Sequence, residues 1–311
     1  MIDDTKIIID PTSRMLYASY YIEGLYSIYG RENVLFSSAP FTGLKRSSSD
    51  FSFEHYFAFI VQKPKKKELR VVIDFCDPPD IHTGAYRWCD RYAKINFNKK
   101  ETQPEYLNKI IPIPPGFGIR IWNFWETFTI CGKNYLKGRK RLKIGKKRLL
   151  RDYFAQFKRP RFKDYQLKDT TSTKSKKPYI FTIASLWKDE TARGTTNQYR
   201  KKFMEAANKA DCIFEGGFYI DKNRIKPKGY TDLLFTKPYT TSAYLKKTKA
   251  SYLVFNTPAV HNCFGWKLAE YLAMGKAILS TPLTNDLSSP LKAGEQLHVI
   301  QANDDFDQTL E

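Results

Sequence analysis

The sequence predicts an α/β protein built from two domains, and three observations support this. At 311 residues the chain exceeds the usual size of a single hydrophobic core. Its content of 42% hydrophobic and 15% aromatic residues is sufficient to form such cores. Short apolar runs alternate with helical patterns in both halves, which is typical of parallel sheets covered by helices.

The first half begins with a strand–helix–strand unit. Residues 6–10 predict a buried strand, residues 14–29 a helix that Ser13 caps and Gly30 ends, and residues 34–36 a second strand. The intervening loop lacks the Gly-x-Gly-x-x-Gly spacing, so no dinucleotide fingerprint is present. The remaining elements expected in this half are strands at 56–61, 70–75, 92–97 and 110–113 and an aromatic-rich helix over 119–135.

The positive charge of the chain is concentrated in one segment. The whole sequence carries a net charge of +20, but residues 133–177 alone hold 18 Lys and Arg against three acids, which gives +15. Within this segment, Leu149, Leu150, Tyr153, Phe154 and Phe157 fall on one face of a helix surrounded by cations. Two interpretations are open: the helix over 146–158 binds an anionic membrane surface, or its apolar face packs on the first domain.

The domain boundaries follow from this pattern. Residues 1–162 form the expected N-terminal domain, including the basic amphipathic segment 133–162, and the Lys-, Ser- and Thr-rich residues 163–178 are the expected linker. The second domain, 179–311, is expected to contain strands at 179–184, 212–214, 252–255, 277–280 and 298–300, and helices at 198–210, 240–249 and from about 304. Glu-Gly-Gly at 215–217 is expected to close the second of these strands.

Residues 250–282 carry the most informative pattern. A strand over 252–255 is followed by a polar loop in which Asn262 is the expected N-cap of a helix. Phe264, Leu268 and Leu272 recur every four residues, and Gly275 is expected to end the helix in a left-handed conformation before the strand at 277–280. This is a parallel crossover, and ligands of open parallel sheets bind beyond the carboxyl ends of the strands, where the loop before the helix lies.

The same stretch resembles a known motif. Its pattern is Asn262-x-Phe264-Gly265-x-x-x-x-Glu270-x-x-Ala273-x-Gly275. It is similar to the donor-site motif of GT-B nucleotide-sugar glycosyltransferases, of the group 1-like type found in bacterial surface polysaccharide assembly. Many retaining members have two glutamates around a Phe-Gly pair, whereas here Asn262 stands in place of the first. The resemblance implies two Rossmann-like domains facing each other across a cleft.

The resemblance also implies ligand roles on the second domain. Glu270 would bind the ribose hydroxyls of a nucleotide-diphosphate sugar, and Asn262 occupies the position that contacts the transferred sugar. The other donor-binding candidates are Lys267, Gly265 and Phe264 at the helix start, His261 in the loop, and Arg193 and Lys188 in the loop after the strand at 179–184. A helix N-terminus favours a diphosphate, and Arg suits bidentate phosphate binding. The resemblance implies no metal and no cofactor besides the donor.

Candidate catalytic residues follow the strand at 70–75 in the first domain. Asp77 is the first candidate for the base that deprotonates an acceptor hydroxyl, and His82 is the second. Asp10 holds an equivalent position after the first strand. Asp and Pro are also standard turn formers, so a purely structural role for this cluster is the alternative.

The sequence thus predicts a hexosyltransferase that uses a glycan or lipid-linked glycan acceptor. Five cysteines without Cys-x-x-Cys spacing and the absence of an apolar run of about 20 residues favour a cytoplasmic protein, peripheral on the membrane at most. Two alternatives remain. One is a nucleic-acid-binding protein that uses the basic tract 133–163, and the other is a donor-binding relative without catalytic activity.

Overall fold

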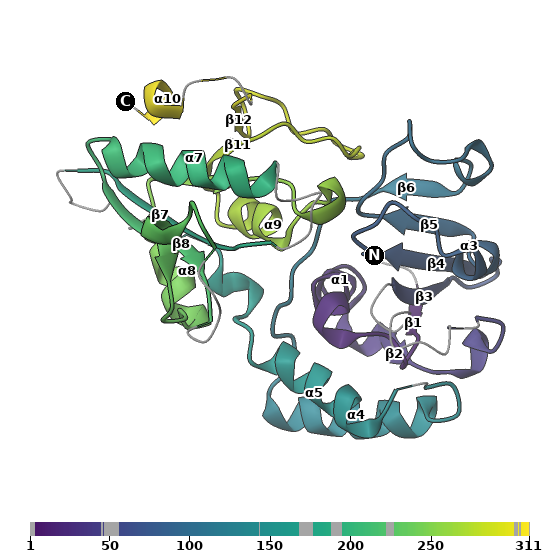
Figure 1. Ribbon diagram of the computed structural model, residues 1–311. Helices are drawn as coiled ribbons and strands as arrows, with labels where there is room; N and C mark the ends of the chain where they lie inside the picture. Colours follow the sequence, from purple (N-terminus) through teal and green to yellow (C-terminus); the bar gives the residue numbers. More distant parts are fainter. Residues whose placement is uncertain are drawn as a thin grey trace. The chain divides into compact units, whose positions relative to one another are not determined.

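A computed structural model shows an α/β protein whose chain divides into two compact units (Figure 1). The first unit comprises residues 1–162 and 286–288, and the second comprises residues 163–285 and 289–311. The structure describes residues 4–44, 46, 56–142, 144–167, 177–187, 195–221, 227–301, 304 and 306–310.

The first unit contains a six-stranded sheet in the order β2-β1-β3-β4-β5-β6. Its strands are β1 (Lys6–Ile9), β2 (Val34–Phe36), β3 (Tyr56–Gln62), β4 (Leu69–Asp74), β5 (Arg91–Lys94) and β6 (Ile110–Pro112). Neighbours pair in parallel except that β3 is antiparallel to both β1 and β4. The sheet is therefore mixed, and its five parallel strands end at the same edge.

Helices cover both faces of this sheet. They are α1 (Met15–Tyr29), α3 (Thr83–Trp88), α4 (Phe124–Gly138) and α5 (Lys146–Phe157). Residues 56–60 of β3 are all buried, as expected for a central strand that is covered on both sides. On one face Tyr56, Ala58 and Ile60 pack with α3. On the other, Tyr17 of α1 lies 5.3 Å from Phe75, measured between ring centroids.

The helix α5 is fixed to this unit by an ionic contact. The N-cap position of α1, Arg14, forms no capping hydrogen bond with its own side chain. Instead the Asp152 carboxylate of α5 accepts hydrogen bonds from the backbone N–H groups of Met15 (2.6 Å) and Leu16 (3.3 Å) and from Arg14 Nε (3.3 Å). A buried carboxylate thus caps α1 and complements its dipole.

The second unit contains two three-stranded parallel sheets, β7-β8-β9 and β10-β11-β12. The strands are β7 (Tyr179–Ser185), β8 (Ile213–Tyr219), β9 (Leu234–Phe235), β10 (Leu253–Asn256), β11 (Ala277–Ser280) and β12 (His298–Val299). The sheets meet at β7 and β10, where the Tyr252 N–H donates to the Tyr179 carbonyl at 2.6 Å. The resulting spatial order, β9-β8-β7-β10-β11-β12, is that of a doubly wound sheet.

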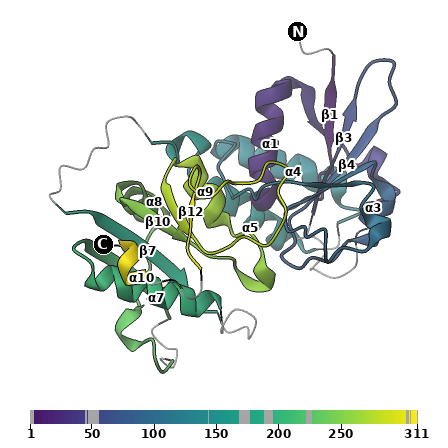
Figure 2. The same cartoon turned by 90° about the horizontal axis from the view of Figure 1, so that it is seen from above.

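Helices flank both faces of these strands as well (Figure 2). They are α7 (Thr196–Lys209), α8 (Thr241–Ala250), α9 (Trp266–Ala273) and α10 (Phe306–Leu310). A buried cluster joins α7 and α10 to the strands, with Phe203 of α7 stacked on Phe255 of β10 at 4.3 Å between ring centroids. On the opposite face the Phe181 ring lies near Tyr244 of α8.

Several expected boundaries differ from the structure for identifiable reasons. The helix expected over 119–135 begins at Phe124, because Asn123 and Glu126 form a reciprocal capping box. The helix that Asn262 was expected to cap begins at Trp266 with Gly265 as N-cap, because His261 and Asn262 both have φ of 55° and cannot enter it. The strand expected to close at 215–217 instead continues to Tyr219.

Gly216 and Gly217 therefore lie inside β8. Their φ angles are +147° and +135°, in the region that favours glycine. A Cβ atom at Gly216 would lie 1.7 Å from the Thr182 carbonyl oxygen, and one at Gly217 would lie 2.2 Å from the Leu233 carbonyl oxygen. The two glycines allow β8 to lie close to the backbone of Thr182 on one side and of Leu233 on the other.

Gly216→Ala is expected to destabilise the protein by about 3 kcal/mol or more, because the added Cβ clashes with backbone and φ is strained. Gly132→Ala is the matched control: Gly132 lies inside α4, where a Cβ meets nothing within 4 Å, and the change is expected to stabilise by about 0.5–1 kcal/mol. Urea unfolding of both variants provides the measurement. Equal stabilities would contradict the close approach at β8.

Candidate functional site

A pocket lies at the carboxyl ends of β7 and β10 in the second unit. It has a volume of about 190 Å³. Its walls come from residues 182–185 and 187, from residues 255–257 and 259 and from the start of α9 at residues 265–267, together with Arg200 of α7. Tyr179, the first residue of β7, is hydrogen-bonded to Tyr252, which precedes β10, and the last residues of both strands line one pocket, so the two strands run in the same direction. This is the place where the strand order of a doubly wound sheet reverses and where such sheets bind ligands.

Two cations contribute to the pocket. Arg200 donates from Nε to the Thr257 hydroxyl at 2.9 Å and from Nη1 to the Ser185 carbonyl at 3.3 Å. Lys267 donates from Nζ to the Ile183 carbonyl. Among the described residues that line the pocket there is no carboxylate. The site is therefore electropositive and suited to an anion.

The environment lowers the pKa of both cations. Burial lowers the pKa of Arg200 to about 10, so its guanidinium stays charged at neutral pH. Burial, together with the charge of Arg200, lowers the pKa of Lys267 to about 7, while Glu270 opposes the shift. Because a nearby like charge disfavours the charged form and an opposite charge favours it, the amine form of Lys267 is poised to gain a proton when an anion enters.

The start of α9 adds a favourable dipole. Gly265, Trp266 and Lys267 belong to the N-cap and first turn of this eight-residue helix and line the pocket. The first backbone N–H groups of a helix have no partner within it, and they attract negative charge. The start of α9, Arg200 and Lys267 thus all make the electrostatic potential of the pocket positive.

The other predicted donor-site residues take up different positions. Glu270 is buried, and its Oε2 accepts a hydrogen bond from the Tyr244 hydroxyl at 2.8 Å; it is not among the described residues lining the pocket. Phe264 is buried, whereas His261 and Asn262 are exposed in the left-handed conformation. Lys188 and Arg193 lie outside the described residues.

An adjoining cavity of about 280 Å³ shares residues 183–185 and Lys267 with the pocket. It is lined on its other side by the rings of Tyr219, Phe235 and Tyr239. Aromatic residues beside an electropositive pocket are suited to a ligand that carries both an aromatic group and phosphate.

In the first unit Asp10 takes part in a closed ionic network. Its carboxylate accepts from Thr12 Oγ1 (2.8 Å), Arg141 Nη1 (2.9 Å) and Arg46 Nη2 (3.3 Å). Burial alone would raise the pKa of Asp10, but the two arginines outweigh it and hold the pKa below its usual range. A fully buried carboxylate held in this way is a poor proton acceptor, so the geometry favours a structural role over the predicted catalytic one.

The other catalytic candidates surround a buried ion pair. Asp74 Oδ2 accepts from Lys94 Nζ at 3.0 Å and from the Tyr92 hydroxyl at 2.6 Å. Asp77 is exposed, and His82 is half-buried with its ring near Tyr56. Burial lowers the pKa of His82, although the nearby Asp74 carboxylate favours its charged form.

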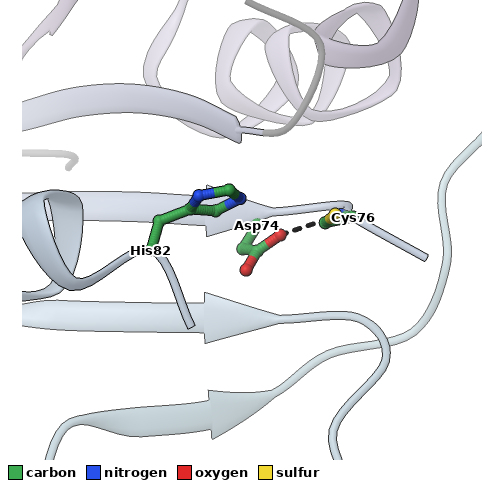
Figure 3. Close-up of side chains that lie close together, drawn as sticks. All are labelled: Asp74, Cys76 and His82. Carbon is green, nitrogen blue, oxygen red and sulfur yellow. Dashed lines mark hydrogen bonds between the residues drawn. The ribbon is translucent and has the colours of Figure 1, made fainter. Parts of the chain in front are cut away.

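Asp74, Cys76 and His82 each place a potential metal-ligand atom within 4.8 Å of the others (Figure 3). The Lys94 ammonium already neutralises the carboxylate, and burial raises the pKa of the Cys76 thiol to about 12. A divalent cation would have to compete with this ammonium and deprotonate that thiol. The arrangement therefore favours a buried ion pair over a metal site.

Sequence reasoning missed Arg200 as a pocket residue. It selected cations of the loop after β7, whereas Arg200 lies one turn into the following helix and reaches back to Ser185. Asn197 in the same turn accepts from the Trp187 N–H, which fixes the end of β7 against α7. A polar face of α7 at Asn197 and Arg200 is the only signal in the sequence that points to this role.

Neither models of known protein families nor the curated proteins match this chain. Among the described residues, no helix combines the length and the hydropathy that crossing a bilayer requires.

The lowered pKa of Lys267 predicts a specific pH dependence of stability. An unfolded lysine titrates near 10.5, so between pH 7 and pH 10 the unfolded chain binds more protons than the folded protein at this residue. The contribution of Lys267 to stability should therefore rise with pH across this range. In urea unfolding at pH 7 and 9.5, the stability of the wild type relative to Lys267→Met should rise with pH, because the other titrating groups act on both proteins alike. Lys246→Met, on the exposed side of α8, is the control and should follow the wild type.

Proposed function

We propose that this chain is a GT-B-like glycosyltransferase that binds a nucleotide-diphosphate sugar in the second unit and transfers its sugar to a glycan or lipid-linked glycan. The observation that supports the proposal most strongly is the pocket at the ends of β7 and β10. It combines Arg200, Lys267 and the start of α9 without a carboxylate among its described lining residues. These are the groups that diphosphate recognition requires.

The proposed chemistry relies on electrostatic stabilisation of the leaving group. When the bond between sugar and diphosphate breaks, negative charge accumulates on the nucleoside diphosphate. Lys267, Arg200 and the helix start would stabilise this charge, so that the transfer needs no divalent metal. The cavity lined by Tyr219, Phe235 and Tyr239 would then accept the nucleobase.

The remaining roles depend on the resemblance. Glu270 is proposed to bind the ribose; it follows Lys267 by three residues on α9, and in the structure it is held by Tyr244. Asn262 and His261 are proposed to face the sugar. In the first unit we retain Asp77 as the proposed acceptor base because it is exposed, with His82 as the alternative.

The diphosphate site predicts binding of UDP or GDP that raises the melting temperature. Arg200→Met and Lys267→Met should each weaken that binding at least tenfold, because each removes a charge-assisted contact to phosphate. Affinity for the wild type should fall as pH rises above about 7, where free Lys267 loses its proton, and Lys267→Met should lose this dependence. Isothermal titration at pH 6.5 and 8.5 measures both effects, with Lys246→Met as control. The site is assigned wrongly if no nucleoside diphosphate binds.

The ribose role of Glu270 is tested separately from the phosphate role. Glu270→Gln keeps the size of the side chain and an acceptor for Tyr244, but it should weaken UDP binding more than pyrophosphate binding, which changes only through the lost support of Glu270 for the charged form of Lys267. An equal loss for both ligands would indicate that Glu270 acts only on the structure of the pocket.

Donor turnover separates the enzyme from a donor-binding relative. A panel of nucleotide sugars, assayed for slow hydrolysis, should yield a released sugar for one donor. Binding without any hydrolysis or transfer would favour the relative without catalytic activity, to which the asparagine at position 262 points.

A further inference from the structure

The helices α4 and α5 lie side by side in the first unit and present an unusual exposed surface (Figure 1). Its large apolar side chains are Phe124 (45% exposed), Trp125 (74%), Phe128 (59%) and Leu136 (63%) on α4 and Leu150 (43%) on α5. Phe154 and Phe157 of α5 are half-buried beside them. We call these seven residues the aromatic face.

Ring contacts join the two helices into one surface. The Phe124 ring lies 5.1 Å from Trp125 and 5.9 Å from both Phe154 and Phe157, measured between ring centroids. Phe154 and Phe157 are themselves 6.2 Å apart. On α4, Trp125, Phe128 and Leu136 follow the helical repeat along one side. The four rings of Phe124, Trp125, Phe154 and Phe157 therefore form a connected patch across the two helices.

Cations border the aromatic face. Lys147 and Arg151 on α5 and Lys158 at its C-cap are exposed and fall at helical spacing beside Leu150 and Phe154. The other exposed cations of the two helices are Lys133 and Lys137 on α4 and Lys146 on α5. The two acids of α4 and α5 are both engaged by other residues of the unit, Glu126 by Arg31 and Asp152 by Arg14.

In the structure, different residues of the 146–158 helix fit the packing interpretation and the membrane interpretation. Leu149 and Tyr153 are buried against the rest of the unit, and Tyr153 stacks on Trp122. These two residues support the packing interpretation. The other apolar residues of the helix remain at the surface, where α4 extends them with Trp125 and Phe128. The surface that is available to a partner thus lacks Leu149 and Tyr153 and includes residues of α4, which the periodicity of α5 alone does not show.

We propose that the aromatic face docks on an anionic lipid membrane. Trp and Phe at its centre would enter the boundary between headgroups and acyl chains, while the bordering cations pair with anionic headgroups. A nucleic acid fits less well, because the centre of the face is apolar and includes two leucines, whereas nucleic acids require cations and open ring faces. This inference does not rest on the proposed transferase activity.

The test uses the full chain and sedimentation with vesicles of phosphatidylcholine alone or with 30% phosphatidylglycerol. The wild type should bind the anionic vesicles at least tenfold more tightly than the neutral ones and should lose affinity as salt rises. Trp125→Ser/Phe128→Ser and Lys147→Glu/Arg151→Glu should each weaken this binding at least tenfold. All four side chains are exposed, so the variants should keep the wild-type melting temperature, which is measured first.

Matched changes on the second unit provide the controls. Tyr252→Ser removes another exposed aromatic ring, and Lys228→Glu/Lys246→Glu alters the net charge equally. Both should bind vesicles as the wild type does. The proposal is overturned if the wild type does not bind anionic vesicles, if the controls lose as much affinity as the face variants, or if the face variants lose single-stranded DNA binding but retain vesicle binding.

Discussion

The candidate site depends on two partly buried cations, Arg200 and Lys267, that line one pocket. Arg200 and Lys267 both have pKa values lowered by burial, and the charge of Arg200 lowers that of Lys267 further. Such an arrangement destabilises the protein without a ligand, since like charges repel and the hydration that they lose is only partly replaced by the Thr257 hydroxyl and two backbone carbonyl groups. An anion between them would reverse this penalty. Charged groups that lower the stability of the folded protein are characteristic of binding sites. The pocket is therefore a stronger functional candidate than the acidic clusters of the first unit.

The order of the strands explains why these groups meet. Residues 182–187 and 255–259 are about 70 positions apart in the chain, yet β7 and β10 are neighbours because the chain returns to the middle of the sheet after β9. The helices that follow the two strands, α7 and α9, then begin on either side of the junction. Each contributes one cation from its first or second turn. The pocket is thus a consequence of the topology, and no single segment of the sequence contains it.

This separation marks the limit of what the sequence could predict. Strands at 34–36 and 277–280 were predicted with the bounds observed, because short apolar runs between polar residues carry a local signal. Gly30 and Gly275 were likewise predicted as helix ends, and their φ angles of 82° and 61° confirm it. Long-range contacts were not predictable. Asp10 was interpreted as catalytic since its partners Arg46 and Arg141 are distant in sequence, and the start of α9 was misplaced because nothing local shows that His261 and Asn262 are left-handed. Arg200 was missed for the same reason.

The cations that give the chain its high net charge lie in two different environments, the exposed surface of α4 and α5 and the pocket of the second unit. Lys147 and Arg151 are exposed on α5, where mobile ions screen a charge over about 8 Å at physiological salt. Arg200 and Lys267 sit in a pocket where such screening is weak and where proton uptake couples to anion binding. An interaction through the α4–α5 surface must therefore respond strongly to salt and little to pH near neutrality. Binding in the pocket must show the opposite pattern, with a marked response to pH and a weaker one to salt. The same residue types thus perform separable tasks, and the burial of each cation, not the total charge, determines which task it can serve.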